Sequence, residues 1–251
     1  MNILLTNDDG IYAEGIYSLY GELSKIATVT IVAPDSERSA SGHAITLTDP
    51  LRVETANKRG KFLGYKVNGT PADCVKIAVE AVLDKKPDLV VSGINRGPNI
   101  GTNVIYSGTV SAATEGVILG IPAIAISLAT FTDPDFSYAA EFGRKICGKV
   151  LKSGMPEGIL LNVNVPAVPG KLIKGVRITH QGGCRFKEFF EKRKDPRGRT
   201  YYWMDGEEIT SGTDNGADHA AIRDNFISIT PIHYDMTCYK YLARLRKWRF
   251  H

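Results

Sequence analysis

Two adjacent carboxylates, Asp8 and Asp9, follow directly on the apolar segment Met1–Leu5, which is typical of a first β-strand. Gly10 lets the backbone turn after them. Like charges this close resist ionising unless a positive charge lies between them. Ligands of open α/β sheets bind beyond the carboxyl ends of the strands. The pair therefore favours a divalent-cation site, with an ordinary Asn-Asp turn as the alternative.

The glycine-rich loop at residues 92–101 supplies a second kind of oxygen ligand. It contains Asn95, whose neutral amide oxygen suits a hard cation as a third or fourth ligand. The glycines of this loop lack the Gly-x-Gly-x-x-Gly spacing of dinucleotide sites, and the chain has no Walker A sequence. The loop is therefore interpreted as a tight turn that carries a cation ligand.

Residues 35–43, after the expected second strand, offer hydroxyls, a cation and an imidazole. A Ser–His nucleophilic pair would need a strand, a Gly-x-Ser-x-Gly turn and a helix in succession, and the sequence lacks this pattern. His43 is therefore interpreted as a hydrogen-bonded structural residue or a substrate contact rather than a metal ligand.

Ser107, Gly108 and Thr109 stand at the expected start of a helix. Hydroxyls and free backbone N–H groups at a helix N-terminus form an anion site, although this motif taken by itself favours a plain Ser/Thr helix cap. Carboxylate, hydroxyl and amide oxygens without a Cys or His cluster select Mg²⁺ or Mn²⁺ over Zn²⁺. A cation opposite an anion site is the arrangement of a metal-assisted phosphoryl hydrolase.

The composition indicates a globular protein with a substantial core. Of the 251 residues, 43% are hydrophobic and 23% are charged. The four cysteines are scattered, which argues against a disulfide framework and a structural zinc site. The N-terminus has no signal-peptide pattern, and the most apolar stretch, residues 116–127, is too short to span a bilayer. A cytoplasmic location without membrane contact is expected.

The net charge of +4 arises at the end of the chain. Five basic residues and no acidic residue follow Asp235, so the remainder carries a net charge of −1. Proteins that bind nucleic acid usually have a basic face on the domain itself. Specific binding to nucleic acid is therefore not expected.

Strand-like and helix-like segments alternate along most of the chain. Runs of Val, Ile and Leu in the strands predict an α/β fold with a Rossmann-like, mainly parallel sheet covered by helices on both faces. Thr70, Pro71 and Asp73 form the pattern of a capping box. Strands are expected over residues 3–5, 28–33, 53–55, 62–67, 89–92, 123–127, 159–163, 176–179 and 226–230, and helices over 12–26, 71–83, 109–119 and 136–151.

The pattern changes near Lys171. A charged stretch over 186–199 and alternation over 201–204 predict an exposed hairpin, and residues 239–250 place apolar side chains at helical spacing among basic ones. That tail could dock on its own subunit or serve as an arm in a homo-oligomer. We therefore divide the chain into an α/β catalytic core (1–180), a hairpin extension with the last core strand (181–234) and an oligomerisation arm (235–251).

Several motifs occur in order along the chain. They are Ile3–Gly10, Arg38–Gly42, Asn68–Val75, Ser92–Asn95 and Tyr106–Val110, with Thr213-Asp214 and Ile229–Pro231 nearer the C-terminus. Together they resemble the SurE family, the stationary-phase survival protein E. The resemblance covers nearly the whole chain and is densest before residue 127.

The resemblance implies a metal-dependent nucleotidase. Members of the family hydrolyse nucleoside 5′-monophosphates and often 3′-monophosphates, and some also shorten polyphosphate. They bind one divalent cation per subunit through residues that correspond here to Asp8, Asp9, Ser39 and Asn95, all of the expected identity. The family fold is a Rossmann-like core with a protruding β-hairpin and a C-terminal arm exchanged within a homodimer or homotetramer.

The leading hypothesis is therefore hydrolysis of a nucleoside monophosphate. The cation, Mg²⁺ or Mn²⁺, would offset charge on the phosphate while a water attacks the phosphorus, with Asp8 as a catalytic residue. Ser107, Gly108 and Thr109 would hold the other phosphate oxygens. Asn7 would orient the water or the phosphate.

Three rival functions share part of this pattern. An aspartyl-phosphate mechanism of the haloacid-dehalogenase type needs two carboxylates separated by one residue, whereas Asp8 and Asp9 are adjacent. A signalling receiver domain needs a phosphoacceptor Asp after its third strand and a Lys after its fifth, and no convincing candidates occur in register. A non-catalytic, metal-dependent nucleotide-binding sensor has the same motifs and stays open.

Overall fold

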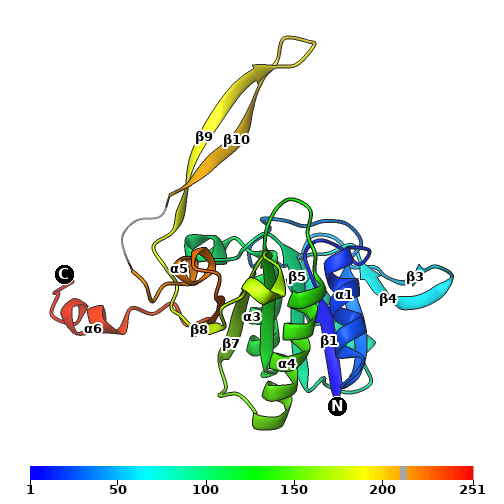
Figure 1. The fold of residues 1–251 in the computed structure, drawn as a ribbon. Helices are drawn as coiled ribbons and strands as arrows, with labels where there is room; N and C mark the ends of the chain where they lie inside the picture. The colour runs from blue at the N-terminus through cyan, green and yellow to red at the C-terminus, as the bar shows by residue number, and fades with distance from the viewer. Residues whose placement is uncertain (210–213, 251) are drawn as a thin grey trace.

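A large mixed sheet organises the chain in the computed structural model, which describes residues 1–209 and 214–250 (Figure 1). Its strands are β1 (Asn2–Thr6), β2 (Thr28–Pro34), β3 (Val53–Lys58), β4 (Lys61–Val67), β5 (Leu89–Arg96), β6 (Ala123–Ala129), β7 (Ile159–Pro166), β8 (Val176–Ile178) and β11 (Ile227–His233). They lie in the order β3-β4-β2-β1-β5-β6-β7-β11-β8. Neighbouring strands are parallel except for β3 against β4 and β11 against β7. Thr213 of the family motif lies outside the described residues.

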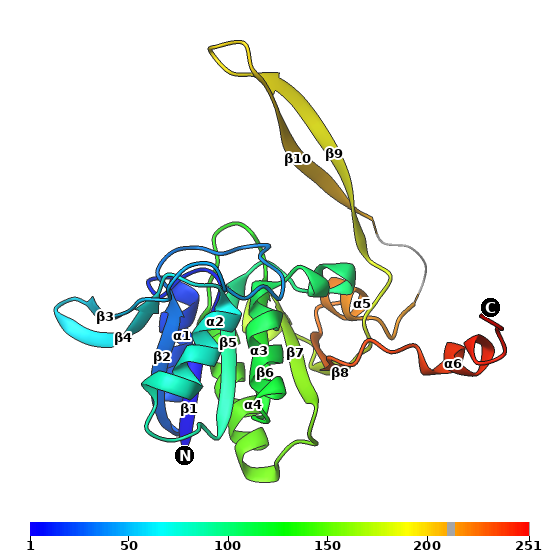
Figure 2. The ribbon, with the colours of Figure 1, turned by 180° about the vertical axis from the view of Figure 1, so that it is seen from behind.

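Helices cover both faces of this sheet (Figures 1 and 2). One face carries α1 (Glu14–Leu23) and α4 (Ser137–Ser153). The other carries α2 (Pro71–Ile77) and α3 (Gly108–Ile118). The prediction of a mainly parallel sheet between two helical layers is confirmed.

The two faces of β1 explain its unbroken apolar sequence. Ile3 and Leu5 pack toward α1 and α4, whereas Leu4 packs toward α2 and α3. All three side chains are fully buried or nearly so. A strand at the centre of a parallel sheet has no solvent face, so it shows no polar alternation until the chain leaves the sheet. The first polar side chains to point out of the core are therefore placed at the carboxyl edge.

The connection from β6 through α4 to β7 has the opposite hand to its neighbours. It moves along the sheet in the same direction as β5–α3–β6, but α4 packs on the face opposite to α3. Parallel crossovers are right-handed as a rule. Here α4 lies against α1, where Gly143 leaves room for Leu19 and Arg144 pairs with Glu22 at 2.9 Å. The unusual hand thus places α4 beside α1 on one face of the sheet.

Among the expected boundaries that differ from the observed ones, two have a local reason. The expected helix over 71–83 is α-helical only to Ile77 and continues as a single π-helical segment, η1 (Ala78–Val82). The last core strand runs through Pro231 to His233 instead of ending at Thr230. Pro231 is tolerated because β8 reaches only as far as Ile229, which leaves that side of β11 an open edge. The short helix α5 (Asp218–Arg223) was not predicted.

The capping box at the start of α2 is present as predicted. The Thr70 hydroxyl accepts from the Asp73 N–H at 3.1 Å, and the Asp73 carboxylate accepts from the Thr70 N–H at 2.9 Å. These two bonds satisfy N–H groups that have no partner inside the helix. The carboxyl edge of the sheet thus receives a helix start whose direction is fixed by its own side chains.

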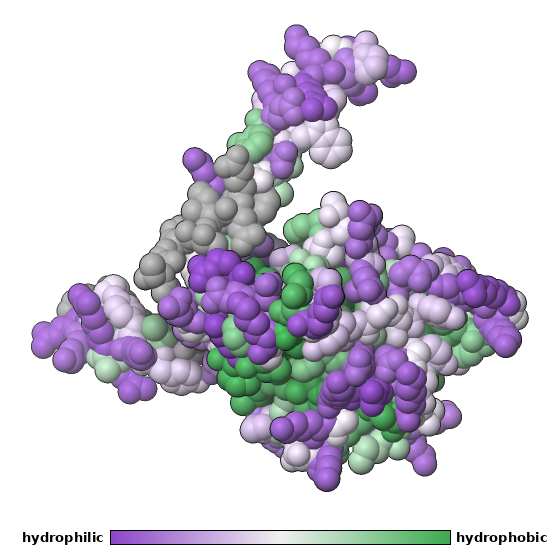
Figure 3. All heavy atoms as spheres, in the orientation of Figure 1, coloured by the Kyte–Doolittle hydropathy of each residue, from purple (hydrophilic) through white to green (hydrophobic). Residues whose placement is uncertain are grey.

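A separate hairpin of β9 (Arg185–Lys194) and β10 (Thr200–Ile209) projects away from the core. The helix α6 (Tyr239–Leu245), near the C-terminus, also lies apart from the core (Figures 1 and 2). Both elements were predicted. Exposed apolar surface accompanies them: Phe190 and Trp203 are more than half exposed on the hairpin. Figure 3 shows further hydrophobic surface gathered on the part of the core where β7 and the edge strand β8 lie, and β8 exposes Val176 and Ile178.

Within the parts of the chain that the structure describes, no helix combines the length and the apolar character needed to cross a bilayer.

The contact between α1 and β5 predicts a large effect of one methyl group. A Cβ at Gly15 would lie 2.0 Å from the Ile94 carbonyl oxygen, so Gly15→Ala forces α1 away from β5. We expect it to lower the free energy of unfolding by about 3 kcal/mol in urea denaturation. Gly21→Ala, in the same helix but with nothing within 4 Å, should instead raise it by up to about 1 kcal/mol. Equal effects of the two changes would contradict the close approach.

Candidate active site

The candidate site lies at a topological switch point of the sheet, where successive chain connections run to opposite sides. From β1 the chain passes to β2 on one side, and β5 and then β6 lie on the other. Asp8 and Asp9 follow β1. Asn95 is the last residue but one of β5, the strand that pairs with β1 and aligns Ser92 with Thr6. When the connections after two neighbouring parallel strands run to opposite sides, they leave a crevice at the carboxyl ends of these strands, and ligands of open α/β sheets bind there.

Asp8 is buried against the start of α3. Only 4% of it is exposed, and its Oδ1 accepts a hydrogen bond from the Thr109 hydroxyl at 2.5 Å. A Cβ at Gly108 would lie 2.8 Å from the Asp8 Cβ, so only glycine permits this approach. Burial raises the pKa of Asp8 to about 6, the Thr109 bond opposes that rise, and the Asp9 charge adds to it. Among the described residues no cationic side chain pairs with this carboxylate, so it is suited to receive a positive charge from a ligand.

Asp9 faces the end of β5. Its carboxylate accepts from the Arg96 N–H at 3.2 Å, which places it beside Asn95. Burial raises the pKa of Asp9, and the nearby Glu37 charge raises it further. The Asn95 amide nitrogen donates to the Gly97 carbonyl at 2.8 Å, which fixes the amide and leaves its oxygen to face the other way. The structure thus places Asp8, Asp9 and Asn95 in one neighbourhood at the carboxyl edge of the sheet.

Ser39 is brought near by its backbone rather than by its hydroxyl. The neighbouring Arg38 N–H donates to the Asp8 carbonyl at 2.8 Å, so the loop lies against the carboxylate pair. The exposed Ser39 hydroxyl donates to Glu37 at 2.6 Å. Glu37 in turn raises the pKa of Asp9, so the Ser39 hydroxyl is directed at a neighbour of the carboxylate pair and not at the pair itself.

The predicted anion site is built mainly from backbone. Ser107 is the N-cap of α3, and its hydroxyl oxygen accepts from the Val110 N–H at 3.1 Å. The Thr109 hydroxyl is committed to Asp8. The Val110 N–H is thus taken by Ser107, and the Thr109 N–H also bonds the Asp8 carboxylate, so the Gly108 N–H remains as the donor that an anion would meet at the positive end of the helix dipole.

Asn7 is buried beside them. Its amide nitrogen donates to the Gly10 carbonyl at 2.9 Å and shapes the turn, and its Oδ1 has no protein partner. A buried amide oxygen without a partner is costly unless a ligand or water meets it. The position therefore has a structural role and one acceptor to spare.

The donor set fits a hard divalent cation. Two carboxylates with raised pKa values, one amide oxygen and an adjacent hydroxyl are ligands of the Mg²⁺ and Mn²⁺ type. The described residues hold no group of three or more His, Cys, Asp or Glu side chains arranged for a metal, so a zinc-type cluster is absent from that part of the chain. A cation between Asp8 and Asp9 would remove the repulsion that the pair otherwise carries.

Sequence reasoning missed the network that holds the loop after β5. Asn164 bonds both the N–H and the carbonyl of Asn99, at 2.8 and 3.0 Å, and Asn162 donates to the same carbonyl at 2.8 Å. The Asn99 amide donates to Ser127 at 2.9 Å. The available signal was the Asn-x-Asn pattern inside the apolar strand β7, since buried amides in a parallel strand need partners. The network fixes the chain between Asn95 and the α3 start.

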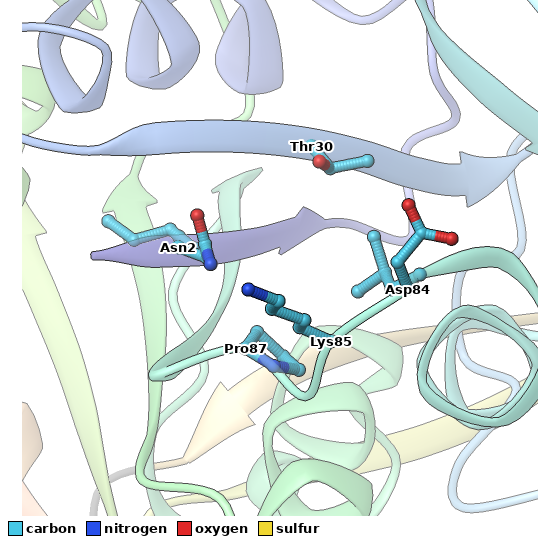
Figure 4. Close-up of a pocket in the computed structure, with 7 residues that line it drawn as sticks. Asn2, Thr30, Asp84, Lys85 and Pro87 are labelled. Atoms are coloured by element: carbon cyan, nitrogen blue, oxygen red, sulfur yellow. The ribbon is translucent and has the colours of Figure 1, made fainter.

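A cavity of about 230 Å³ lies at the opposite edge of the sheet, beside the amino end of β1 (Figure 4). Its lining includes Asn2, Thr30, Asp84 and Lys85. It presents one lysine, one carboxylate and few other polar groups. Ligands of parallel sheets bind at the other edge, so this cavity does not compete with the carboxylate site.

Comparisons with known proteins agree with the motifs. Residues 3–188 match the family model described as "Survival protein SurE". The chain is 50% identical to a protein of Syntrophobacter fumaroxidans over 99% of both chains, and 54% identical to one of Syntrophus aciditrophicus over 98% of this chain and 93% of the relative. Both relatives are named "5'-nucleotidase SurE".

A solved structure has the same fold. The crystal structure of the Sure protein from Aquifex aeolicus superposes with a TM-score of 0.86 at 42% sequence identity, over 98% of each chain. The opposite-handed crossover and the projecting hairpin therefore belong to an arrangement already seen in a crystal, because the match includes nearly every residue.

The raised pKa of Asp8 predicts an unusual pH dependence of stability. In the metal-free protein the unfolded chain ionises near pH 3.8, and the folded one near pH 6. The folded state therefore holds the extra proton in between, and the free energy of unfolding should fall by roughly 2 kcal/mol from pH 4 to pH 6. Denaturant titrations at several pH values check this. Asp8→Asn should remove most of the decline and leave the smaller part that the raised pKa of Asp9 contributes, whereas an undiminished decline in this variant would contradict the assignment to Asp8.

Proposed function

The chain belongs to the SurE family, and we propose that it is a metal-dependent nucleotidase that releases phosphate from nucleoside 5′-monophosphates. The observation that carries this proposal is the coincidence of two findings. Relatives named 5′-nucleotidases match the chain at about half of all positions over nearly its full length. The residues that gather at the carboxyl edge are carboxylates and an amide beside a helix start. Such a site suits a phosphoric monoester hydrolase.

We propose one Mg²⁺ or Mn²⁺ per subunit, held by Asp8, Asp9, Ser39 and Asn95. The contacts of Asp9 with Arg96 and of Arg38 with Asp8 support this set, because they bring all three segments to one place. Ser39 would exchange its bond to Glu37 for the cation. A bound divalent cation supplies positive charge to the phosphate oxygens in the transition state and lowers the pKa of a nearby water.

The protein's own groups would orient the reactants. The Gly108 N–H binds a phosphate oxygen at the helix start, and Ser107 and Thr109, which flank it, would contact the phosphate from either side. Asn7, which holds the turn after β1 through its bond to the Gly10 carbonyl, would orient the water or the phosphate through the position of that turn. The Thr109 hydroxyl keeps the Asp8 carboxylate in one rotamer. The new bond joins the water oxygen to phosphorus, the ester P–O bond breaks, and the nucleoside oxygen leaves with a proton.

The family relationship disfavours the sensor alternative. A sensor would bind the nucleotide and retain it, whereas the related proteins are named for hydrolysis. The 3′-monophosphate and polyphosphate activities implied by the family resemblance use the same phosphate site. We include them in the substrate panel below.

We also propose that the chain forms a homodimer or homotetramer. The hairpin exposes apolar side chains on both of its faces, since Phe190 pairs with Met204 and Trp203 with Glu191 across the two strands. A two-stranded sheet without a covering layer is marginally stable in water. Cover from a second copy would explain the hairpin (within 181–234) and the arm (235–251) as assembly elements attached to the core (1–180).

Asp8→Asn should abolish turnover while the fold survives. With Mg²⁺ or Mn²⁺ the wild type should release phosphate from nucleoside monophosphates, and the variant should lose at least about 100-fold in rate. A panel of 5′- and 3′-monophosphates and polyphosphate, each with metal or chelator, ranks the substrates. Asp84→Asn, at the far edge of the sheet, is the matched control and should stay active. Undiminished turnover by Asp8→Asn in chelator would overturn the proposed site.

Trp203→Glu should shift the assembly toward smaller species in light scattering coupled to size exclusion. Trp203 is 59% exposed on the hairpin, so the change costs the isolated subunit little but places a charge where a second copy would pack. Removing residues 235–251 should act in the same direction. Phe62→Glu is the control, because Phe62 is 58% exposed on β4 at the other end of the sheet. A wild-type chain that elutes as a monomer would refute the assembly.

A further inference from the structure

The long loop between β2 and β3, residues 35–52, crosses the carboxyl edge of the sheet above α2 and α3 (Figure 2). Long loops without regular structure in a compact fold are usually functional. This one carries Ser39 near its start. Its middle part, Gly42–Thr46, which we call the strap, is tied to three other segments by hydrogen bonds.

The first tie is between His43 of the strap and Glu115 of α3. His43 Nε2 lies 2.9 Å from Glu115 Oε2, and the Glu115 side chain is only 3% exposed. Its other oxygen meets Lys76 Nζ of α2 at 2.6 Å. Burial raises the pKa of Glu115, but the bonds from His43 and Lys76 outweigh that effect and hold it below its ordinary value. A charged group is thus kept inside the helical layer.

The second tie joins the far end of the strap to the capping box of α2. Thr46 donates to Asp73 through its N–H at 3.0 Å and through its hydroxyl at 2.6 Å. The Ala44 carbonyl accepts from the Thr70 hydroxyl at 2.7 Å. Asp73 thereby serves the helix start and the strap together. The strap cannot leave α2 without breaking bonds on both of the capping residues.

The near end is tied to the two halves of the candidate site. The Gly42 N–H donates to the Tyr106 carbonyl at 3.1 Å, just before the α3 start. The Arg38 N–H donates to the Asp8 carbonyl at 2.8 Å. Ser39 lies between these two anchors. Its backbone position is therefore set by Asp8 on one side and by the strap on the other.

We propose that Glu115 is a positioning residue for the cation site, which acts through His43 and the strap to hold Ser39 within reach of Asp8 and Asp9. The inference rests on the proposed function, because Ser39 is a ligand only if the proposed cation site exists. Lys76 alone could balance the Glu115 charge from the exposed side. The His43 bond adds a link from the middle of α3 to the loop, and this link is the one that reaches the site. Groups that orient a ligand from outside the coordination shell commonly affect metal affinity strongly.

The test compares His43→Ala and Glu115→Met with Lys76→Met. The first two changes cut the tie, and the third removes the other ion pair of Glu115 without touching the strap. Limited trypsin digestion of metal-free protein, read by mass spectrometry at the Arg38–Ser39 bond, measures release of the loop. We expect cleavage about 5- to 30-fold faster in the first two variants and unchanged in Lys76→Met. His43→Gln, which keeps a donor, should restore part of the protection.

Mn²⁺ binding measured by calorimetry is the second readout. We expect the first two variants to bind about tenfold more weakly, with Lys76→Met unchanged. Faster cleavage with unaltered Mn²⁺ affinity would overturn the proposal, and so would wild-type cleavage in both variants. If Glu115→Met does not fold, Thr46→Val releases the other tie and must show the same two effects. A wild type that binds no Mn²⁺ would refute the proposed function, whereas the cleavage ratio would still report on the strap.

Discussion

The contact between the Asp8 carboxylate and the start of α3 governs the rest of the site. A carboxylate that is 96% covered is costly unless hydrogen bonds and a positive charge meet it. The Thr109 hydroxyl and the absent side chain of Gly108 let α3 begin directly on top of it. The helix thereby presents its positive end, with the Gly108 N–H, beside a carboxylate pair. Donors for an anion and ligands for a cation thus share one edge, which is the requirement for binding a metal–phosphate pair.

Two hydrogen-bond networks hold that edge in place. In the first network, the buried amides of Asn162 and Asn164 on β7 fix the loop after β5 through Asn99. In the second network, the strap ties the loop after β2 to α2 and α3. Two loops that would otherwise be free are therefore rigidly placed relative to Asp8. A site assembled from four separate segments needs such support, because catalysis depends on geometry held to within fractions of an ångström.

The core and the extensions follow different rules. In the core, both faces of the sheet are covered, and even the unusual hand of the β6–α4–β7 connection serves to pack α4 on α1. The hairpin has only two strands and exposes aromatic side chains. Its ten-residue strands pair with each other without a covering layer among the described residues. An element of this kind gains little from its own subunit, which is why we look to a second copy for its cover.

The sequence alone determined the α/β class, nearly all of the strands and helices, the capping box of α2 and the residues that meet at the carboxyl edge. These follow from local patterns: apolar runs for buried strands, helix-start residues, and polar residues placed immediately after a strand. Tertiary structure alone decided the hand of the α4 crossover, the passage of β11 through Pro231, the Asn99 network and the tie from His43 to Glu115. Each of these joins residues far apart in the chain, such as the 72 positions between His43 and Glu115. A local pattern carries no information on such partners, because packing and burial select them only once the sheet is assembled.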